Sequence, residues 1–146
     1  MNTEHYKKLE KMYLNANINK MIFDTTTIKI SHKTAEIGLT ISEKYFHALG
    51  AIHGSVYFKL LDDSAFFAVN SMVEDAFVLT TSFNLNIVRP ATSGLLKAIG
   101  EIRYESKNLF TAQSTLYNEE GKEIAFATGN FAKSKIELSE KIGYKF

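Results

Sequence analysis

The segment from residue 54 to residue 72 constrains the fold more than any other, because it is apolar on nearly every side and shows no alternation. A helix of this kind is buried on most of its faces rather than along one stripe. The whole chain has 146 residues, a length typical of one domain. We therefore expect a single long helix at the centre of the molecule, with the other elements packed around it.

Strand-like segments lie on both sides of the predicted helix. Residues 25–32 are rich in β-branched side chains, which favour strands. Residues 35–41 alternate between apolar and polar positions, as a half-buried strand does, and His32 and Lys33 form the predicted hairpin turn between the two segments. Four more strands are expected after the helix, at residues 83–87, 96–105, 109–117 and 123–133. The short connections between the last three, including a turn at residues 118–122, indicate an antiparallel meander.

The two ends of the chain carry weaker signals. The first 20 residues predict an N-terminal helix, with the clearest amphipathic pattern over residues 3–14 and Thr3 as a candidate N-cap. The predicted apolar face of this helix consists of Tyr6, Leu9 and Tyr13. The tail at residues 138–146 contains two aromatic side chains, Tyr144 and Phe146. They dock on the sheet, dock on a neighbouring subunit or stay mobile, and the sequence leaves these alternatives open.

The predicted order is helix, two strands, one long buried helix and four strands. A sheet with its helix segregated to one face is an α+β layer architecture. The simplest arrangement is a curved antiparallel sheet wrapped around the central helix, which is the hotdog fold. We expect residues 1–146 to form one such domain.

Composition excludes several classes of function. Hydrophobic residues make up 45% of the chain, enough for a core, while the net charge of +1 gives no electrostatic basis for binding nucleic acid. The absence of cysteine excludes disulfides, zinc–thiolate sites and cysteine nucleophiles. No apolar segment reaches the length of a membrane span, and the first 20 residues are too polar for a secretion signal. We therefore expect a cytoplasmic protein that binds neither nucleic acid nor membrane.

The predicted central helix carries two adjacent aspartates that differ in their neighbours. Asp63 lies four residues after Lys59, a spacing that allows an ion pair across one helical turn. Asp62 has a phenylalanine four residues away on each side, at Phe58 and Phe66, in an otherwise apolar stripe. Apolar surroundings raise the pKa of a carboxyl group and make it a better base. Asp62 is therefore the candidate catalytic carboxylate, and the alternative is a side chain that reaches solvent or an N-terminal partner.

His53 and Gly54 stand at the entrance to the helix, where free backbone N–H groups and the helix dipole favour negative charge. Together with a carboxylate, such a site suggests chemistry on a carbonyl group. We favour a structural role for His53 in orienting the loop, with a general base as the alternative. His47, on the same loop, lines a pocket or is exposed. The four histidines show no metal-ligand spacing, so we expect no metal site.

Residues 34–135 resemble the acyl-CoA thioesterases of the hotdog superfamily, specifically the PaaI-like group of the phenylacetate pathway. That group has the pattern Asn-x-x-Gly-x-x-His-Gly-Gly, followed by a buried helix with an aspartate nine residues after the histidine. Asp62 has the same spacing in this chain, and residues 80–91 resemble the strand that follows the helix in the group. The corresponding motif here is His47-x-x-Gly50-x-x-His53-Gly54-Ser55.

The resemblance implies a role for each matching residue. Asp62 corresponds to the catalytic carboxylate, acting as general base toward water or as nucleophile on the thioester. The N–H of Gly54 corresponds to the donor that polarises the carbonyl, and Thr80 lies where a hydroxyl helps to position water or the aspartate. The other implied contacts with substrate are His53, Ser55, Arg89, Lys107 and Asn108, the last three toward CoA.

The same resemblance implies the partners of the chain. The substrate is an acyl-CoA, no separate cofactor is needed, and homodimers pair into tetramers with each active site at a dimer interface. Asp62 of one subunit then faces Gly54 of the other. Burial of an exposed sheet edge between two subunits agrees with this expectation.

Two positions depart from the pattern of the group. His47 replaces the asparagine, and a histidine there substitutes for it, changes the pH profile or disables the site. Ser55 replaces the second glycine, but it keeps its backbone N–H and can cap the helix. The expected function is hydrolysis of a small or medium acyl-CoA. The alternatives are a non-catalytic hotdog protein that binds acyl-CoA, or a dehydratase on acyl carrier protein, which needs His53 to face the substrate.

Overall fold

The computed structural model describes residues 2–146. Six strands within this range form one antiparallel sheet in the order β1-β2-β4-β5-β6-β3. The helices are α1 (Thr3–Asn15), α2 (Asn17–Met21) and α3 (Gly54–Asn70), with 3₁₀ turns η1 (Glu43–Tyr45) and η2 (Glu140–Ile142). The strands are β1 (Thr27–Ser31), β2 (Thr34–Thr40), β3 (Ala76–Ile87), β4 (Leu95–Glu105), β5 (Leu109–Tyr117) and β6 (Glu123–Glu137). None of the helices in this part of the chain is long and apolar enough to cross a membrane.

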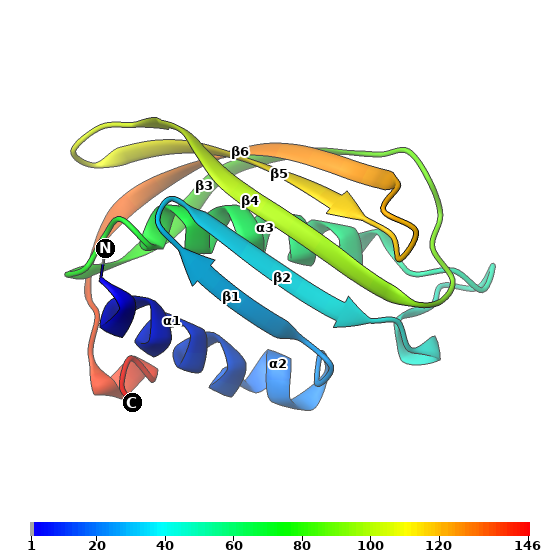
Figure 1. Cartoon of the computed structure of the whole chain (residues 1–146), viewed down its shortest axis with the longest axis horizontal. Helices are drawn as coiled ribbons and strands as arrows, with labels where there is room; N and C mark the ends of the chain where they lie inside the picture. Colours follow the sequence, from blue (N-terminus) through cyan, green and yellow to red (C-terminus); the bar gives the residue numbers. More distant parts are fainter. Residues whose placement is uncertain (1) are drawn as a thin grey trace.

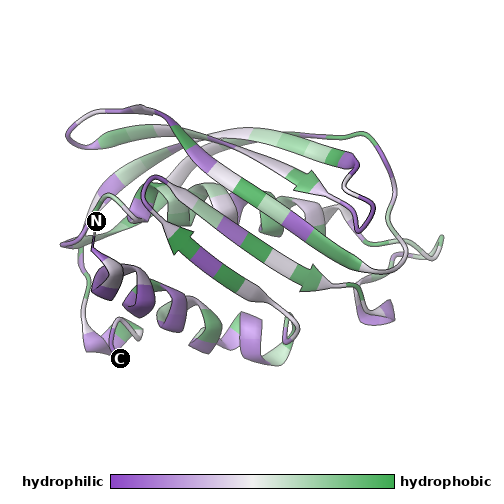
Figure 2. Ribbon diagram, in the orientation of Figure 1, coloured by the Kyte–Doolittle hydropathy of each residue, from purple (hydrophilic) through white to green (hydrophobic). Residues whose placement is uncertain are grey.

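The sheet curves around α3, which lies inside the curve (Figure 1). Leu60, Leu61 and Ala68 of α3 are fully buried against apolar side chains of the strands. Hydrophobic and polar residues alternate along β1, β2 and β4, so that one face of the sheet is apolar (Figure 2). Gly100 of β4 allows the close approach, since a Cβ there would lie 2.2 Å from the backbone of Ser64. The expected α+β hotdog architecture is confirmed.

Several boundaries differ from those expected. β3 begins at Ala76, not at residue 83, and two register shifts against β6 disturb its alternation. β6 continues to Glu137, and α3 ends at Asn70. At the N-terminus the helix of the first 20 residues is two helices, α1 and the short α2. Asn2, rather than Thr3, caps α1, because the Asn2 side chain accepts a hydrogen bond from the backbone N–H of His5.

The C-terminal tail packs on α1. The hydroxyl of Tyr144 lies 2.7 Å from Nδ1 of the buried His5, whose Nε2 lies 2.8 Å from the carbonyl oxygen of Asn70 at the end of α3. One imidazole thus joins the first helix, the central helix and the tail. Figure 1 shows the C-terminal segment beside α1, and α1 itself packs on β1.

Candidate active site

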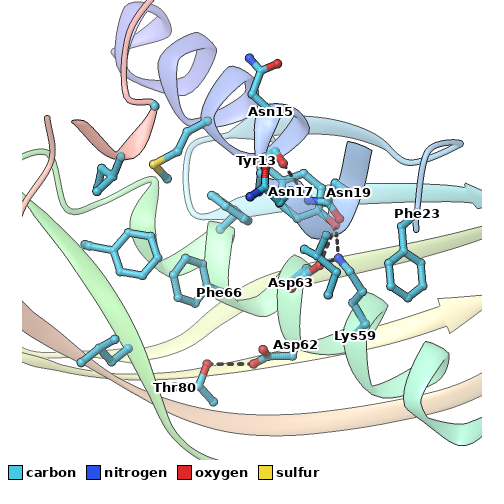
Figure 3. Close-up of a pocket in the computed structure, with 18 of the residues that line it drawn as sticks. Tyr13, Asn15, Asn17, Asn19, Phe23, Lys59, Asp62, Asp63, Phe66 and Thr80 are labelled. Atoms are coloured by element: carbon cyan, nitrogen blue, oxygen red, sulfur yellow. Dashed lines mark hydrogen bonds and ion pairs between the residues drawn. The ribbon is translucent and has the colours of Figure 1, made fainter. Parts of the chain in front are cut away.

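The carboxylate of Asp62 projects from the middle of α3 into a cavity of about 1340 Å³. Thr80 of β3 donates a hydrogen bond from Oγ1 to Asp62 Oδ1 over 2.9 Å (Figure 3). Burial raises the pKa of Asp62 to about 6, although the Thr80 hydrogen bond acts in the opposite direction. Asp62 is therefore a carboxylate that takes up and releases a proton near neutral pH.

The adjacent Asp63 points away from this position and is fully paired (Figure 3). It forms the expected ion pair with Lys59 and accepts a hydrogen bond of 2.6 Å from the hydroxyl of Tyr13 in α1. The Lys59 ammonium also lies over the rings of Tyr13 and Phe23, at 4.9 and 4.8 Å from their centroids. These contacts give Asp63 a role in holding α1 against α3 and leave Asp62 as the carboxylate without a cation partner.

The entrance to α3 is organised by a histidine cap. His53 is the N-cap, and its Nδ1 accepts from the backbone N–H of Ser55 at 3.1 Å and lies 2.8 Å from the Ser55 hydroxyl. His53 therefore orients this loop. Within residues 2–146 the N–H of Gly54, the first residue of the helix, has no hydrogen-bond partner. It is a free donor at the positive end of the helix dipole.

Gly54 lines a second, smaller hollow of about 360 Å³. His47 and Arg89 line the same hollow, together with the buried Tyr57, whose hydroxyl donates to the Arg89 carbonyl oxygen over 2.8 Å. His47 is also tied to its own loop, since its Nδ1 accepts from the backbone N–H of Leu49 at 3.1 Å. The two residues that depart from the expected motif thus lie in different places. His47 lines the second hollow together with Gly54, whereas Ser55 lines the large cavity.

The predicted site residues form two groups in one chain. Asp62 and Gly54 are eight residues apart on the same helix, which corresponds to about 12 Å along its axis. Lys107 and Asn108 are exposed in the β4–β5 turn, where the Asn108 carbonyl oxygen accepts from the N–H of Lys133. The backbone N–H of Arg89 instead donates a hydrogen bond to the carbonyl oxygen of Ile124, near the other end of β6. The two attachment points on β6 are nine positions apart, about 30 Å, so Arg89 does not converge with Lys107 and Asn108 within a single chain.

Aromatic side chains of α3 line the large cavity. Phe58, Phe66 and Phe67 belong to its wall, whereas Tyr57 belongs to the second hollow. Sequence reasoning missed the opposite wall, which consists of Phe77 and Leu79 of β3, Ile136 of β6, residues of α1 and α2, and the C-terminal segment. The β-branched and aromatic residues from Phe77 to Thr81 were a signal for the missed part of β3.

No group of three or more histidine, aspartate or glutamate side chains in residues 2–146 is arranged to hold a metal ion. The polar groups that face the large cavity near Asp62 are instead hydroxyl, carboxylate and ammonium groups. Their chemistry suits proton transfer and the orientation of water.

Comparisons with known proteins agree with the fold. The structure is similar to the PaaI protein of the Escherichia coli phenylacetic acid degradation operon, with a TM-score of 0.83, 19% identity, and coverage of 93% of this chain and 97% of that chain. It is also similar to a thioesterase of Haemophilus influenzae (TM-score 0.76, 19% identity, 87% and 88% covered) and to a conserved protein of Pseudomonas aeruginosa (0.76, 17%, 83% and 96%). No curated protein sequence matches the chain. The model of the thioesterase superfamily matches residues 49–125, and the chain therefore belongs to that superfamily.

Proposed function

We propose that this protein hydrolyses the thioester of a small or medium acyl-CoA, with Asp62 as general base or nucleophile. The observation that carries the proposal is the carboxylate of Asp62, which projects into the large cavity without a cation partner, accepts a hydrogen bond from Thr80 and has its pKa raised to about 6 by burial. A carboxylate of that pKa is ionised at neutral pH, yet is basic enough to accept a proton from water. Membership of the thioesterase superfamily supports this class of reaction.

The two possible roles of Asp62 lead to the same products. As a base, Asp62 takes a proton from water, and the resulting hydroxide attacks the thioester carbon. As a nucleophile, it attacks that carbon itself and forms an anhydride that water then hydrolyses. In both routes the carbon–sulfur bond breaks, the CoA thiolate leaves and takes up a proton, and the acyl group is released as a carboxylic acid. The oxyanion that forms needs a donor, and the free N–H of Gly54 is suited to that role.

A second copy of the chain would bring the two groups together. β3 is an edge strand of the sheet formed by residues 2–146. Thr80, in its N-terminal half (the Thr80 end), donates the hydrogen bond to Asp62. Gly54 lies at the other end of β3, where a Cβ would be 3.8 Å from Cδ1 of Ile87. Antiparallel pairing of two β3 edges places the Thr80 end of one copy beside the Ile87 end of the other. Such a homodimer would set Asp62 opposite the partner's Gly54, and pairing of dimers into a tetramer remains part of the proposal.

The second hollow suits the carbonyl and CoA side of the substrate. His47 borders the Gly54 N–H there and is proposed to orient the carbonyl or the attacking water. Arg89 supplies a cation for a CoA phosphate. Ser55 and His53 shape the helix entrance, while Lys107 and Asn108 are proposed to meet CoA only from a neighbouring subunit. No cofactor is required beyond the CoA of the substrate itself.

The dehydratase alternative receives no support from the position of His53. Its Nδ1 is occupied by the helix cap, and His53 lines neither the large cavity nor the second hollow. A protein that binds acyl-CoA without hydrolysing it is the remaining alternative, and the following experiment distinguishes it.

Thiol release from a series of acyl-CoAs tests the function directly. We expect hydrolysis by the wild type, and a loss of at least a hundredfold in kcat for Asp62→Asn with the fold intact by circular dichroism. Asp75→Asn is the matched control, because the side chain of Asp75 is exposed, pairs with Lys133 and does not line the cavity. Unchanged turnover in Asp62→Asn would contradict the role of this carboxylate. Tight binding of acyl-CoA without thiol release would favour the non-catalytic alternative.

A further inference from the structure

We propose that the C-terminal segment, residues 140–145, forms the far wall of the acyl pocket and sets the length of the acyl chain that this protein accepts. The inference rests on the proposed function, and it concerns the same cavity. Glu140, Lys141, Ile142, Gly143 and Lys145 all line the cavity into which Asp62 projects. The C-terminal segment is therefore part of the wall of this cavity.

The segment is held in place by contacts with α1 and with Asp75. Leu138, just before it, is buried and donates from its N–H to the carbonyl oxygen of Asp75 at 3.3 Å. Gly143 has a φ of +91°, which favours glycine, and it lies against α1, where a Cβ would be in ordinary van der Waals contact with Met12 at 3.6 Å from its Cα. Beyond it, Tyr144 bonds to His5, and the Lys8 ammonium lies 4.9 Å from the centroid of the Phe146 ring. Anchors on both sides of the segment make it a fixed wall.

Aromatic and aliphatic side chains line the cavity between Asp62 and this wall, whose charged residues are Glu140, Lys141 and Lys145. Phe66 lies one helical turn beyond Asp62 on α3, and its ring centroid is 5.2 Å from that of Phe77 on β3. Ile136 of β6 and Ile142 of the tail complete this end of the cavity, where β6 runs into the tail. The polar side chains of Lys59 and Asp63 are instead occupied with each other and with α1. An aliphatic acyl chain is thus the ligand whose chemistry fits this branch.

The strand geometry gives the depth of the branch. Phe77 precedes Thr80 by three residues on β3, which is about 10 Å at the rise of a strand. An extended chain advances about 3.5 Å for every three bonds, so about 10 Å holds about eight or nine bonds. Straight acyl chains of about six to ten carbons would extend from Thr80 to Phe77, and Ile142, the aliphatic residue of the tail that lines the same cavity, is the side chain proposed to meet the end of the chain.

Variants of Ile142 test this inference in the full-length protein. Ile142→Ala deepens the pocket, and we expect the ratio of kcat/KM for dodecanoyl-CoA over octanoyl-CoA to rise about tenfold, since one methylene in an apolar pocket changes the rate at least that much. Ile142→Phe should lower the same ratio. Ile22→Ala is the matched control, because Ile22 is an exposed isoleucine that does not line the cavity. It should leave the ratio unchanged.

A binding series keeps the test independent of turnover. S-octyl-CoA and S-dodecyl-CoA are thioethers that cannot be hydrolysed, and their dissociation constants measure the same preference by titration calorimetry. A shift toward the longer chain in Ile142→Ala supports the wall, even in a protein that hydrolyses no acyl-CoA. Equal chain-length preferences in the wild type and both Ile142 variants would overturn it. Absence of hydrolysis with a shifted preference would overturn the proposed function alone.

Discussion

Replacing Asp62 with asparagine should stabilise the folded protein while it removes activity. Burial raises the pKa of Asp62 from 3.8 to about 6, which means that the fold disfavours the ionised form. Asparagine has nearly the same shape and no charge, so it escapes this penalty. A gain in stability from the loss of a charged group is expected where function, rather than folding, retains that group.

The sign and size of the effect depend on pH. Below about pH 4 the carboxyl group is protonated in both the folded and the unfolded chain, and the penalty is absent. Between about pH 4 and pH 6 the unfolded chain loses its proton first, so the free energy of unfolding of the wild type falls as the pH rises. A difference between 3.8 and about 6 corresponds to about 3 kcal/mol for a fully shielded group. Because Asp62 is only half-buried, we expect a gain of about 1 to 2 kcal/mol at pH 7.5.

Urea denaturation of both proteins at a fixed protein concentration, at pH 4 and at pH 7.5, measures this difference. Asp63→Asn is an informative comparison, because it leaves the largely buried Lys59 without its carboxylate and should destabilise the fold by about 2 kcal/mol. The reasoning is refuted by an Asp62→Asn protein that is no more stable than the wild type at pH 7.5, or by a gain of the same size at pH 4.

Three further predictions follow from the contacts of the site. The pH profile of kcat/KM should rise with a midpoint near pH 6. The hydrogen bond from Thr80 lowers the pKa of Asp62, so its removal in Thr80→Val should move the midpoint upward by about half a unit to one unit. Thr81→Val is the control and should not move the midpoint, because Thr81 bonds to Asn130 instead. Gly54→Pro should keep the helix, since proline suits the first position of a helix, but it removes the free N–H. It should therefore reduce kcat about a hundredfold to a thousandfold in the thiol-release assay. Gly54→Ala keeps the N–H and should reduce kcat far less. Tyr144→Phe should lower the free energy of unfolding by about 1 kcal/mol in urea, through loss of the bond to His5, and an unchanged midpoint would show that the tail is held by packing alone.

The features that the sequence predicted well depend on short, regular spacing. The central helix begins at Gly54, and ten of its 17 residues are buried, as its apolarity indicated, whereas the face with Ser55, Phe58 and Asp62 lines the large cavity. β5 spans residues 109–117, the predicted range, because its alternation is unbroken from end to end. The distinction between Asp62 and Asp63 also came from spacing, since an ion pair between residues four apart on a helix needs no knowledge of the rest of the fold.

The features that the sequence did not predict depend on distant contacts or on irregular geometry. The first half of β3 was missed because its register shifts near Ala76 and Thr80 break the period of two that identifies a strand. The position of Tyr144 depends on His5, which lies 139 residues earlier in the chain. The large cavity draws its walls from α1, α2, α3, β3, β6 and the tail, and no local pattern shows that these segments meet.

The spacing of Gly54 and Asp62 along α3 sets the distance between the proposed oxyanion donor and the proposed catalytic carboxylate of one chain. Eight residues separate Gly54 from Asp62, and a helix converts that number into about 12 Å. A nucleophile and an oxyanion donor must both lie within about 3 Å of the same carbonyl carbon and oxygen, so these two residues of one chain cannot serve one thioester. If both act on the same substrate, the motif describes halves of two different sites, and the free edge of β3 is the surface on which two copies would join them.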